Sequence, residues 1–396
     1  MSRFKTLLLL LLPPLLPRPV SGAAPLPATP LQLPTVDDVL AGAPLVDGHN
    51  DFPIYIRAFY HNHIYGRNFS DALPLAGQVD FPRLREGRLG AQFWSVYVEC
   101  PAGDGDDGAT PLLETVQQID LMRRLVDHFP TQLRWARSAS DVWAQWRSGP
   151  RAGVASLMGV EGLHQVGGSP AAALRLFHAL GVRYATLAHV CHNAFADSAA
   201  PALPRHGGLS PAGRAVVREM NRIGLIVDLS HVSADTARQA LRLSRAPVLF
   251  SHSSAAALCP IPRNVPDDVL HALRANDGVV MVNFYPPFVA CAANATLADV
   301  ADHIVYIGEL IGYRHVGLGA DFDGMGFDAG PVGLEHVGKY PALLAELLRR
   351  GVGLHHVRGV AGANVLRVLA AVEEVAAKMA SVEPLEDDVE PMVASW

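Results

Sequence analysis

The chain has 396 residues, half of them hydrophobic, and a formal net charge of -6. A chain of this length can bury a large core, either as a single barrel or as two smaller domains. The acidic balance and the lack of a basic cluster beyond the N-terminal segment argue against nucleic acid as a partner.

Residues 1–24 have the pattern of a secretory signal peptide. Arg3 and Lys5 precede the apolar run 7–16, and small residues follow from 21 to 24. A retained membrane anchor is the alternative, but the run is about half of the roughly 20 residues that a span needs, and prolines interrupt it. The acidic tail, 376–396, lacks the apolar stretch that precedes a lipid anchor. We therefore expect a secreted protein without a membrane span or a lipid anchor.

The expected elements begin with a spacer and a short helix in residues 25–44. The helix covers Val36–Leu40, with Thr35 as its N-cap. Apolar runs then alternate with helical patterns from residue 45 to about 375. The runs that we interpret as strands are Leu45–Gly48, Ala91–Val98, Val154–Val160, Tyr184–Ala188, Leu225–Leu229, Val248–Phe250, Val279–Phe284 and Val316–Gly319.

Helical patterns separate these strands and predict parallel βα units. They include Leu112–Phe129, Ala171–Leu180, Pro211–Ile223 and Asp235–Leu243, and the last long ones are Val300–Ile311 and Pro341–Arg350. The strands are nearly continuous apolar runs, as expected when both faces of a sheet are buried.

About eight such units predict an α/β fold, a single-domain (β/α)8 barrel of the TIM type. A doubly wound open sheet is the competing fold. The first strand, however, is followed by VDGHND and not by a Gly-rich phosphate loop. Polar residues also end at least six strands, and a barrel gathers those ends around one axis, whereas an open sheet spreads them along an edge.

Five polar residues at strand ends are candidate metal ligands. His49 and Asp51 form an HxD pair, and residues two apart in an extended segment point the same way. Glu161 ends another strand, where a buried carboxylate is costly unless it is paired or metal-bound. His231 and His252 each end a short strand, in VDLSH and LFSH. Together they predict an amidohydrolase-type centre for two metal ions, with Glu161 able to bridge them.

Three further residues are candidates for chemistry on a substrate. Asp321 ends HVGLGAD, where a carboxylate could take a proton from water and pass it to a leaving amine. His189 ends YATLAH and could polarise or hold a substrate carbonyl. Arg263, in the loop after LFSH, suits a substrate carboxylate because a guanidinium makes bidentate contacts. We expect the histidines on helices and turns to be solvated, namely His128, His178, His271, His303, His336, His355 and His356.

The four cysteines and two sequons fit secretion. The cysteines are Cys100, Cys191, Cys259 and Cys291. An even count suggests two disulfides, with three possible pairings, and the absence of a CxxC spacing argues against a zinc-thiolate site. Asn68 and Asn294 lie in sequons and are candidate glycosylation sites.

A family resemblance rests on motifs that occur in one order along the chain. They are VDGHND, GAQFWSVY, GVEG, LIVDLSHVS, APVLFSHSSA, RNVPDDVL and GADFDG. They resemble the membrane (renal-type) dipeptidases, a family of zinc amidohydrolases, from about Val46 to Val368. The HNHIYGRNF stretch is more similar to fungal members. The resemblance implies a (β/α)8 barrel that hydrolyses dipeptides with a free C-terminal carboxylate, by a hydroxide held between two zinc ions.

The resemblance also implies a metal ligand set and two disulfides. It assigns one zinc ion to His49 and Asp51, and the other to His231 and His252, with Glu161 as the bridge. It pairs Cys100 with Cys191 and Cys259 with Cys291.

For the substrate, the resemblance implies that His189 contacts both the dipeptide and the tetrahedral oxyanion. It implies that Arg263 holds the substrate carboxylate and that Asp321 is the acid/base. Phe195 stands where family members usually have Trp, which leaves the side-chain preference open. The extra cysteine that links the mammalian dimer is missing, so we expect any homodimer to be non-covalent.

Two other hypotheses for the function remain at this point. The same metal centre could act on another carboxylate-bearing amide, such as an N-acyl amino acid, a Cys-Gly conjugate or a β-lactam-like ring. A non-catalytic binding protein that kept the fold would be favoured by a lost ligand, but all five ligands are present.

Overall fold

The structure, a computed structural model, describes residues 33–66, 77–101, 109–149, 153–326 and 329–389. The expected signal peptide, most of the spacer and the sequon at Asn68 lie outside these ranges. The signal peptide and the glycosylation of Asn68 therefore remain predictions.

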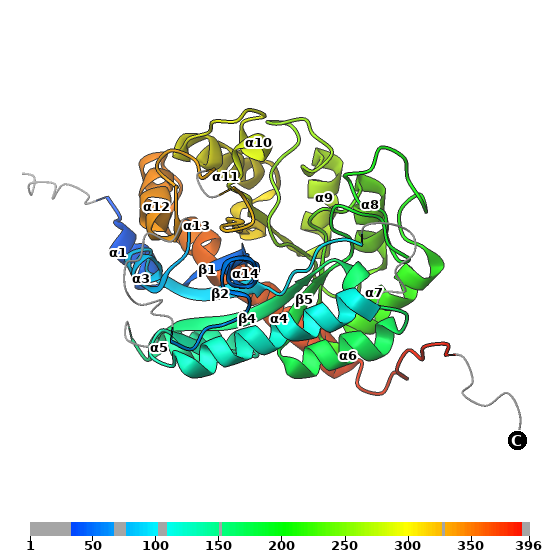
Figure 1. Ribbon diagram of the computed structural model, residues 1–396. Coiled ribbons are helices and arrows are strands. Elements are labelled where there is room, and N and C mark those ends of the chain that lie inside the picture. The colour runs from blue at the N-terminus through cyan, green and yellow to red at the C-terminus, as the bar shows by residue number, and fades with distance from the viewer. Residues whose placement is uncertain (1–32, 67–76, 102–108, 150–152, 327–328, 390–396) are drawn as a thin grey trace, which may run out of the picture. The chain divides into compact units, whose positions relative to one another are not determined.

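Eight parallel strands close into a barrel (Figure 1). The strands of the sheet are β1 (Leu45–Asn50), β2 (Leu89–Ser95), β3 (Leu133–Trp135), β4 (Val154–Glu161), β5 (Val182–Thr186), β6 (Ile226–Asp228), β7 (Leu249–Phe250), β8 (Val279–Val282) and β9 (Val316–Leu318). The ring runs β1-β2-β4-β5-β6-β7-β8-β9 and returns to β1. This closure confirms the predicted (β/α)8 barrel and excludes the open sheet.

β3 is the one strand that the sequence did not predict, and it lies outside the ring. It pairs only with the first residues of β4, whose opposite edge is taken by β2. Its three residues, LRW, are too short and too mixed to stand out as an apolar run.

Helices connect the strands and surround the barrel (Figure 1). They are α1 (Val36–Leu40), α2 (Phe52–Tyr60), α3 (Phe81–Glu86), α4 (Ala109–His128), α5 (Ala139–Arg147), α6 (Pro170–Leu180), α7 (Pro211–Ile223), α8 (Ala234–Leu243), α9 (Asp267–Asn276), α10 (Pro286–Val289), α11 (Leu297–Ile311), α12 (Tyr340–Arg349), α13 (Leu354–Arg358) and α14 (Asn364–Lys378). The expectation that the last long helix ends near Arg350 was wrong. α14 follows directly after the π-helical segment Gly359–Ala363, and the boundary expected at residue 375 falls inside α14.

Capping residues in the sequence fix several helix ends. α7 begins after Ser210, whose hydroxyl accepts a backbone N–H of the first turn, and Pro211 is its first residue. It ends at Gly224, whose φ of 81° lies in the left-handed region that favours glycine. α1 has Thr35 as its N-cap, as predicted, and forms a capping box with Asp38.

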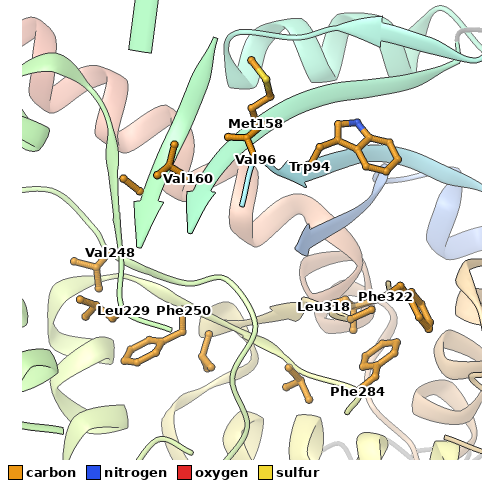
Figure 2. Close-up of a cluster of buried hydrophobic side chains, with 14 of the residues drawn as sticks. Trp94, Val96, Met158, Val160, Leu229, Val248, Phe250, Phe284, Leu318 and Phe322 are labelled. Carbon is orange, nitrogen blue, oxygen red and sulfur yellow. The ribbon is translucent and has the colours of Figure 1, made fainter. Parts of the chain in front are cut away.

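Side chains alternate between the barrel interior and the layer beneath the helices. On β2, Phe93 belongs to the interior cluster and Trp94 to the outer cluster. On β4, Leu157 and Met158 divide in the same way. Figure 2 shows part of the outer cluster, including Trp94, Met158 and Val160. Burial of both faces explains why the strands read as continuous apolar runs.

Both disulfides lie on the side of the barrel where the strands end. Cys100 follows β2 and is bonded to Cys191, which follows β5. Cys259 lies in the segment before α9 and is bonded to Cys291, just after α10. These are the pairings that the family resemblance implies.

The C-terminal segment beyond α14 crosses the ends of α6 and α7. The Asp387 carboxylate accepts hydrogen bonds from the backbone N–H groups of Ala171 and Ala172 in the first turn of α6, at 2.9 and 2.8 Å. Ser169, the N-cap residue of α6, makes no such bond with its side chain. Asp387 therefore caps this helix from a distant part of the chain.

Burial corrects the expectation for the helical histidines. His303, on α11, is fully buried, and its ring accepts from the Ala255 N–H and donates to the Val289 carbonyl. His178, on α6, is half-buried. The helical periodicity of the sequence does not show which neighbouring element covers a given histidine.

Two further findings concern a membrane span and the sequon at Asn294. Among the described helices, none combines the length and the apolar character needed to cross a membrane. Asn294 is exposed, as a glycan acceptor must be.

Removing either disulfide should lower the free energy of unfolding. The bonded cysteines are 91 and 32 residues apart, and in the chain-entropy model closing such loops contributes about 5 and about 4 kcal/mol respectively. Denaturant unfolding of the Cys100→Ala/Cys191→Ala and Cys259→Ala/Cys291→Ala variants measures both losses. Non-reducing peptide mapping of the wild type provides the control, and any other pairing would contradict the assignment.

Acid should destabilise the protein partly through His178. Burial, followed by the charge of Arg183, lowers the pKa of this imidazole from 6.5 to about 4. Between these values the unfolded chain binds a proton that the folded protein does not, so stability is lost as the pH falls. We expect His178→Gln to gain stability relative to wild type from about pH 7 to about pH 5. Melting temperatures test this, with the exposed His271→Gln as the matched control, and equal pH profiles for all three proteins would contradict it.

Candidate metal centre

The structure brings the eight predicted site residues together at the carboxyl end of the barrel. They are His49 in β1, Asp51 after it, Glu161 in β4, His189 after β5, His231 after β6, His252 after β7, Arg263 in the next loop and Asp321 after β9. The barrel thus gathers the ends of six strands at one mouth.

Glu161 lies between two groups of candidate ligands. Its Oε1 is 3.1 Å from Nε2 of His231 and 3.2 Å from Nε2 of His252. Its Oε2 is 3.4 Å from Nε2 of His49, which in turn is 3.1 Å from Oδ2 of Asp51. Because the two oxygens face different groups, this carboxylate has the geometry of a bridge between two ions.

The donor set fits divalent metal ions better than it fits hydrogen bonds alone. Nε2 of His231 and Nε2 of His252 are 2.8 Å apart, so two atoms of the same ligand type face each other. Oδ1 of Asp51 is buried and has no hydrogen-bond partner among the described residues. In the groups His49–Asp51–Glu161 and Glu161–His231–His252, the ligand atoms lie within 4.8 Å of one another. Imidazole and carboxylate ligands of this kind suit zinc.

Burial also sets the protonation of the ligands. Burial, followed by the charge of Arg263, holds the pKa of His231 well below its usual range. Burial, followed by His49, does the same to the pKa of His252. Both imidazoles are therefore neutral, which is the form that binds metal. Burial raises the pKa of Glu161, and the neighbouring His49 opposes that rise.

The backbone around the ligands is strained. His231 and Asp321 have φ angles of 63° and 68°, in the left-handed region that residues with a side chain rarely adopt. Gly324 packs closely against the same turn. A Cβ at this position would lie 2.3 Å from Oδ2 of Asp51 and 2.6 Å from Oδ1 of Asp321, so only glycine leaves these carboxylates in place.

Asp321 forms a third group of potential ligands with His49 and His252. Its Oδ2 accepts a hydrogen bond of 2.8 Å from the side-chain amide of Asn283. Burial raises the pKa of the Asp321 carboxyl to about 7, and the His49 charge opposes this effect. A carboxyl group with a pKa near neutrality is suited to take up and release a proton.

His189 lies beside the bridge. Its Nε2 is 3.6 Å from Oε1 of Glu161, and its ring centre is 4.7 Å from that of Tyr97. Burial, followed by the charge of His164, lowers the pKa of His189 to about 3. The ring is therefore neutral and can donate one hydrogen bond to a substrate oxygen.

Arg263 is held along one edge of its guanidinium. Nη1 donates to Oγ of Ser253 and Nη2 donates to the His252 carbonyl, both at 2.8 Å. The guanidinium also lies over the ring of Phe288, 5.4 Å from its centre. Nε is buried and has no partner among the described residues, so it remains able to bind a carboxylate.

Further polar residues, which were not predicted from the sequence, orient the candidate ligands. The Tyr184 hydroxyl lies 2.8 Å from Nδ1 of His49, and the Ser251 hydroxyl lies 2.8 Å from Nδ1 of His252. Serine directly precedes histidine in both VDLSH and LFSH, and this repeated dipeptide could have pointed to Ser230 and Ser251. No sequence pattern indicates this role for Tyr184, because a tyrosine inside an apolar strand is expected to be a core residue.

Comparisons with known proteins agree with this geometry. The family described as "Membrane dipeptidase (Peptidase family M19)" matches residues 33–383. Dipeptidase aclJ from Aspergillus oryzae is 59% identical over 360 residues, which cover 90% of this chain and 84% of that protein. Dipeptidase tcpJ from Claviceps purpurea is 49% identical over 88% of this chain and 81% of its own. Both are fungal, as the HNHIYGRNF stretch suggested.

Solved structures give the same result. A metallo peptidase from Rhodobacter sphaeroides, liganded with a phosphinate mimic of the dipeptide L-Ala-D-Ala, aligns with a TM-score of 0.72 and 26% identity over 84% of this chain and 99% of its own. An amidohydrolase from Pseudomonas aeruginosa aligns with a TM-score of 0.70 and 26% identity, over 85% of this chain and 99% of that chain. Since the family match covers the barrel and every strand end at its mouth, the chain belongs to the membrane dipeptidase family, peptidase family M19, and is a metallo-dipeptidase.

Proposed function

We propose that this protein is a secreted dipeptidase that uses two zinc ions to hydrolyse dipeptides with a free C-terminal carboxylate. The observation that carries the proposal is the position of the Glu161 carboxylate between two pairs of candidate ligands, His49 with Asp51 and His231 with His252. In this proposal His49 and Asp51 hold one ion, and His231 and His252 hold the other.

The zinc ions, when bound, supply Lewis acidity and lower the pKa of water, so that hydrolysis proceeds near neutral pH. The chain's own residues divide the remaining work. Asp321 carries a proton from the attacking water to the departing amine. His189 donates a hydrogen bond to the oxygen that becomes negative at the peptide carbonyl.

Arg263 is proposed to anchor the substrate carboxylate. Its Nη atoms are held by hydrogen bonds, and its buried Nε has no partner among the residues that the structure describes, so the guanidinium favours an anionic group close to the metal ions. With the carboxylate held there and the scissile bond at the metal ions, the substrate is limited to two residues. The ligand on the Rhodobacter sphaeroides relative, a mimic of a dipeptide, supports this substrate class.

Secretion and a non-covalent homodimer complete the proposal. Secretion is supported by the N-terminal pattern and by the use of all four cysteines in intrachain disulfides. The same use of all four cysteines leaves none to link two subunits. Asn68 and Asn294 are the proposed glycan acceptors.

Glu161→Ala should lower zinc occupancy at both positions, because this carboxylate faces both ligand groups. Asp51→Ala should mainly affect one position. Elemental analysis after gel filtration should give about two zinc ions per chain for the wild type. Full zinc retention in Glu161→Ala would remove the bridge from the proposal.

Arg263→Ala should mainly raise KM for dipeptides and should weaken discrimination against dipeptide amides. Loss of a charge-assisted bidentate contact removes roughly 2 kcal/mol or more of binding, equivalent to a change of about 30-fold or more. Steady-state kinetics on a dipeptide and its C-terminal amide measure the change, and zinc content shows that the centre remains intact. A wild type that cleaves both substrates equally well would rule out the anchor, and the assignment would become a broader amidohydrolase.

A further inference from the structure

The carboxylate of Asp228, at the end of β6, makes hydrogen bonds with none of the proposed metal ligands among the described residues. It is fully buried. Its Oδ1 accepts hydrogen bonds from the backbone N–H groups of Ser230 (3.2 Å) and Ser251 (2.8 Å). Its Oδ2 accepts from the hydroxyls of Thr186 (2.5 Å) and Ser251 (2.7 Å).

The Ser251 hydroxyl connects this carboxylate to a metal ligand. Its oxygen lies 2.7 Å from Oδ2 of Asp228 and 2.8 Å from Nδ1 of His252. A hydroxyl has one hydrogen, and a carboxylate only accepts. The same hydroxyl lies 3.3 Å from Oγ of Ser230, but the 2.7 Å contact with the Asp228 carboxylate is shorter and charge-assisted, which assigns the hydrogen to Asp228. The Ser251 oxygen then accepts a hydrogen bond from Nδ1 of His252, which therefore carries the imidazole hydrogen. Nε2 of His252 is left with a free lone pair.

That lone pair points into the metal centre. Nε2 of His252 faces Oε1 of Glu161 at 3.2 Å and Nε2 of His231 at 2.8 Å. The opposite tautomer would place a hydrogen where an ion should bind. Partners that fix the tautomer of a metal-binding histidine commonly change metal affinity by 10–100-fold when they are removed.

We propose that Asp228 is a positioning residue of the metal centre. Acting through Ser251, it holds His252 in the Nδ1–H tautomer and so sets the zinc affinity of the position formed by Glu161, His231 and His252. The inference rests on the proposed function, because it requires His252 to be a zinc ligand. It adds residues that touch neither zinc nor substrate.

The same network reaches the substrate anchor. The Ser230 hydroxyl accepts from the His252 N–H at 3.0 Å and lies 3.2 Å from the Ser253 hydroxyl. The Ser253 hydroxyl in turn accepts from Arg263. The backbone N–H of His252 is therefore held by Ser230, which the Ser251 hydroxyl contacts only at 3.3 Å. A change confined to the Ser251 hydroxyl should therefore affect the tautomer more than the position of the histidine.

Thr186 provides a matched control for Ser251. Both hydroxyls donate to the same oxygen of Asp228 and both are fully buried, but only that of Ser251 reaches the imidazole. Ser251→Ala and Thr186→Val each remove one hydroxyl with little change in volume. A role confined to supporting the fold would make the two variants alike.

The experiment is a zinc titration against a chromophoric chelator, with Co²⁺ absorption spectra as a second readout. We expect Ser251→Ala to bind one equivalent as tightly as wild type and the other 10–100-fold more weakly. Thr186→Val should keep both affinities within about twofold. Melting of the chelator-treated proteins shows whether the variants remain folded and how much stability each has lost.

Asp228→Asn gives a second, stronger test. Its amide presents N–H groups toward Ser251, which turns the hydroxyl hydrogen toward Nδ1 of His252 and favours the wrong tautomer. We expect a larger loss of zinc affinity at one position than in Ser251→Ala. Should this variant fail to fold, the comparison of Ser251→Ala with Thr186→Val still decides the question.

Two kinds of failure are distinguishable. If wild type binds two zinc ions and Ser251→Ala keeps both affinities, or matches Thr186→Val, the role of Asp228 is overturned while the dipeptidase proposal stands. If wild type does not bind a second ion, the two-zinc assignment fails, and with it the inference drawn from it.

Discussion

The rest of the site depends on one constraint, the burial of the Glu161 carboxylate. Burying a charge costs several kcal/mol unless opposite charges or hydrogen bonds compensate for it. Ser95 is one hydrogen-bonding partner, at 3.2 Å, and beyond it the carboxylate faces imidazoles from three other strands. These three imidazole rings carry too little positive charge to compensate for the clustered carboxylates. Bound cations therefore supply the remaining positive charge. A closed barrel is needed because only closure brings β1, β6 and β7 within reach of one residue on β4.

Below the carboxyl ends of the strands, a further set of buried polar groups keeps the candidate ligands in place. Asp47 in β1 accepts from the Tyr340 hydroxyl at 2.7 Å and from the Gln92 amide at 3.1 Å, and so ties the first strand to β2 and α12. It also accepts from the Ala320 N–H at 2.9 Å, one residue before Asp321. Asp47 thus does for β1 and β9 what Asp228 does for β5, β6 and β7. The charged groups near the substrate are therefore positioned by groups that never meet it.

The convergence of the candidate ligands could be predicted from the sequence because each follows an apolar run, and the end of a parallel strand has a fixed position in a barrel. The supporting contacts could not, since they depend on which segments become neighbours. Asp47 and Tyr340 are 293 positions apart, and nothing near either residue indicates the other. His303 was expected in solvent for the same reason. α14 was missed because the glycines just before it, in Gly359–Ala363, resemble a loop.

The contact between Asp387 and the first turn of α6 has a practical consequence for handling the protein. A chain shortened to end at Lys378 would leave the N–H groups of Ala171 and Ala172 without their acceptor, and Arg175 would lose its contact with the Leu385 carbonyl. Loss of a helix cap typically costs about 1 kcal/mol. A purification tag or surface tether should therefore follow the acidic tail and not replace it. Residues 379–389 lie outside the barrel, but the hydrogen bonds of Leu385 and Asp387 hold α6 and α7 of the outer layer.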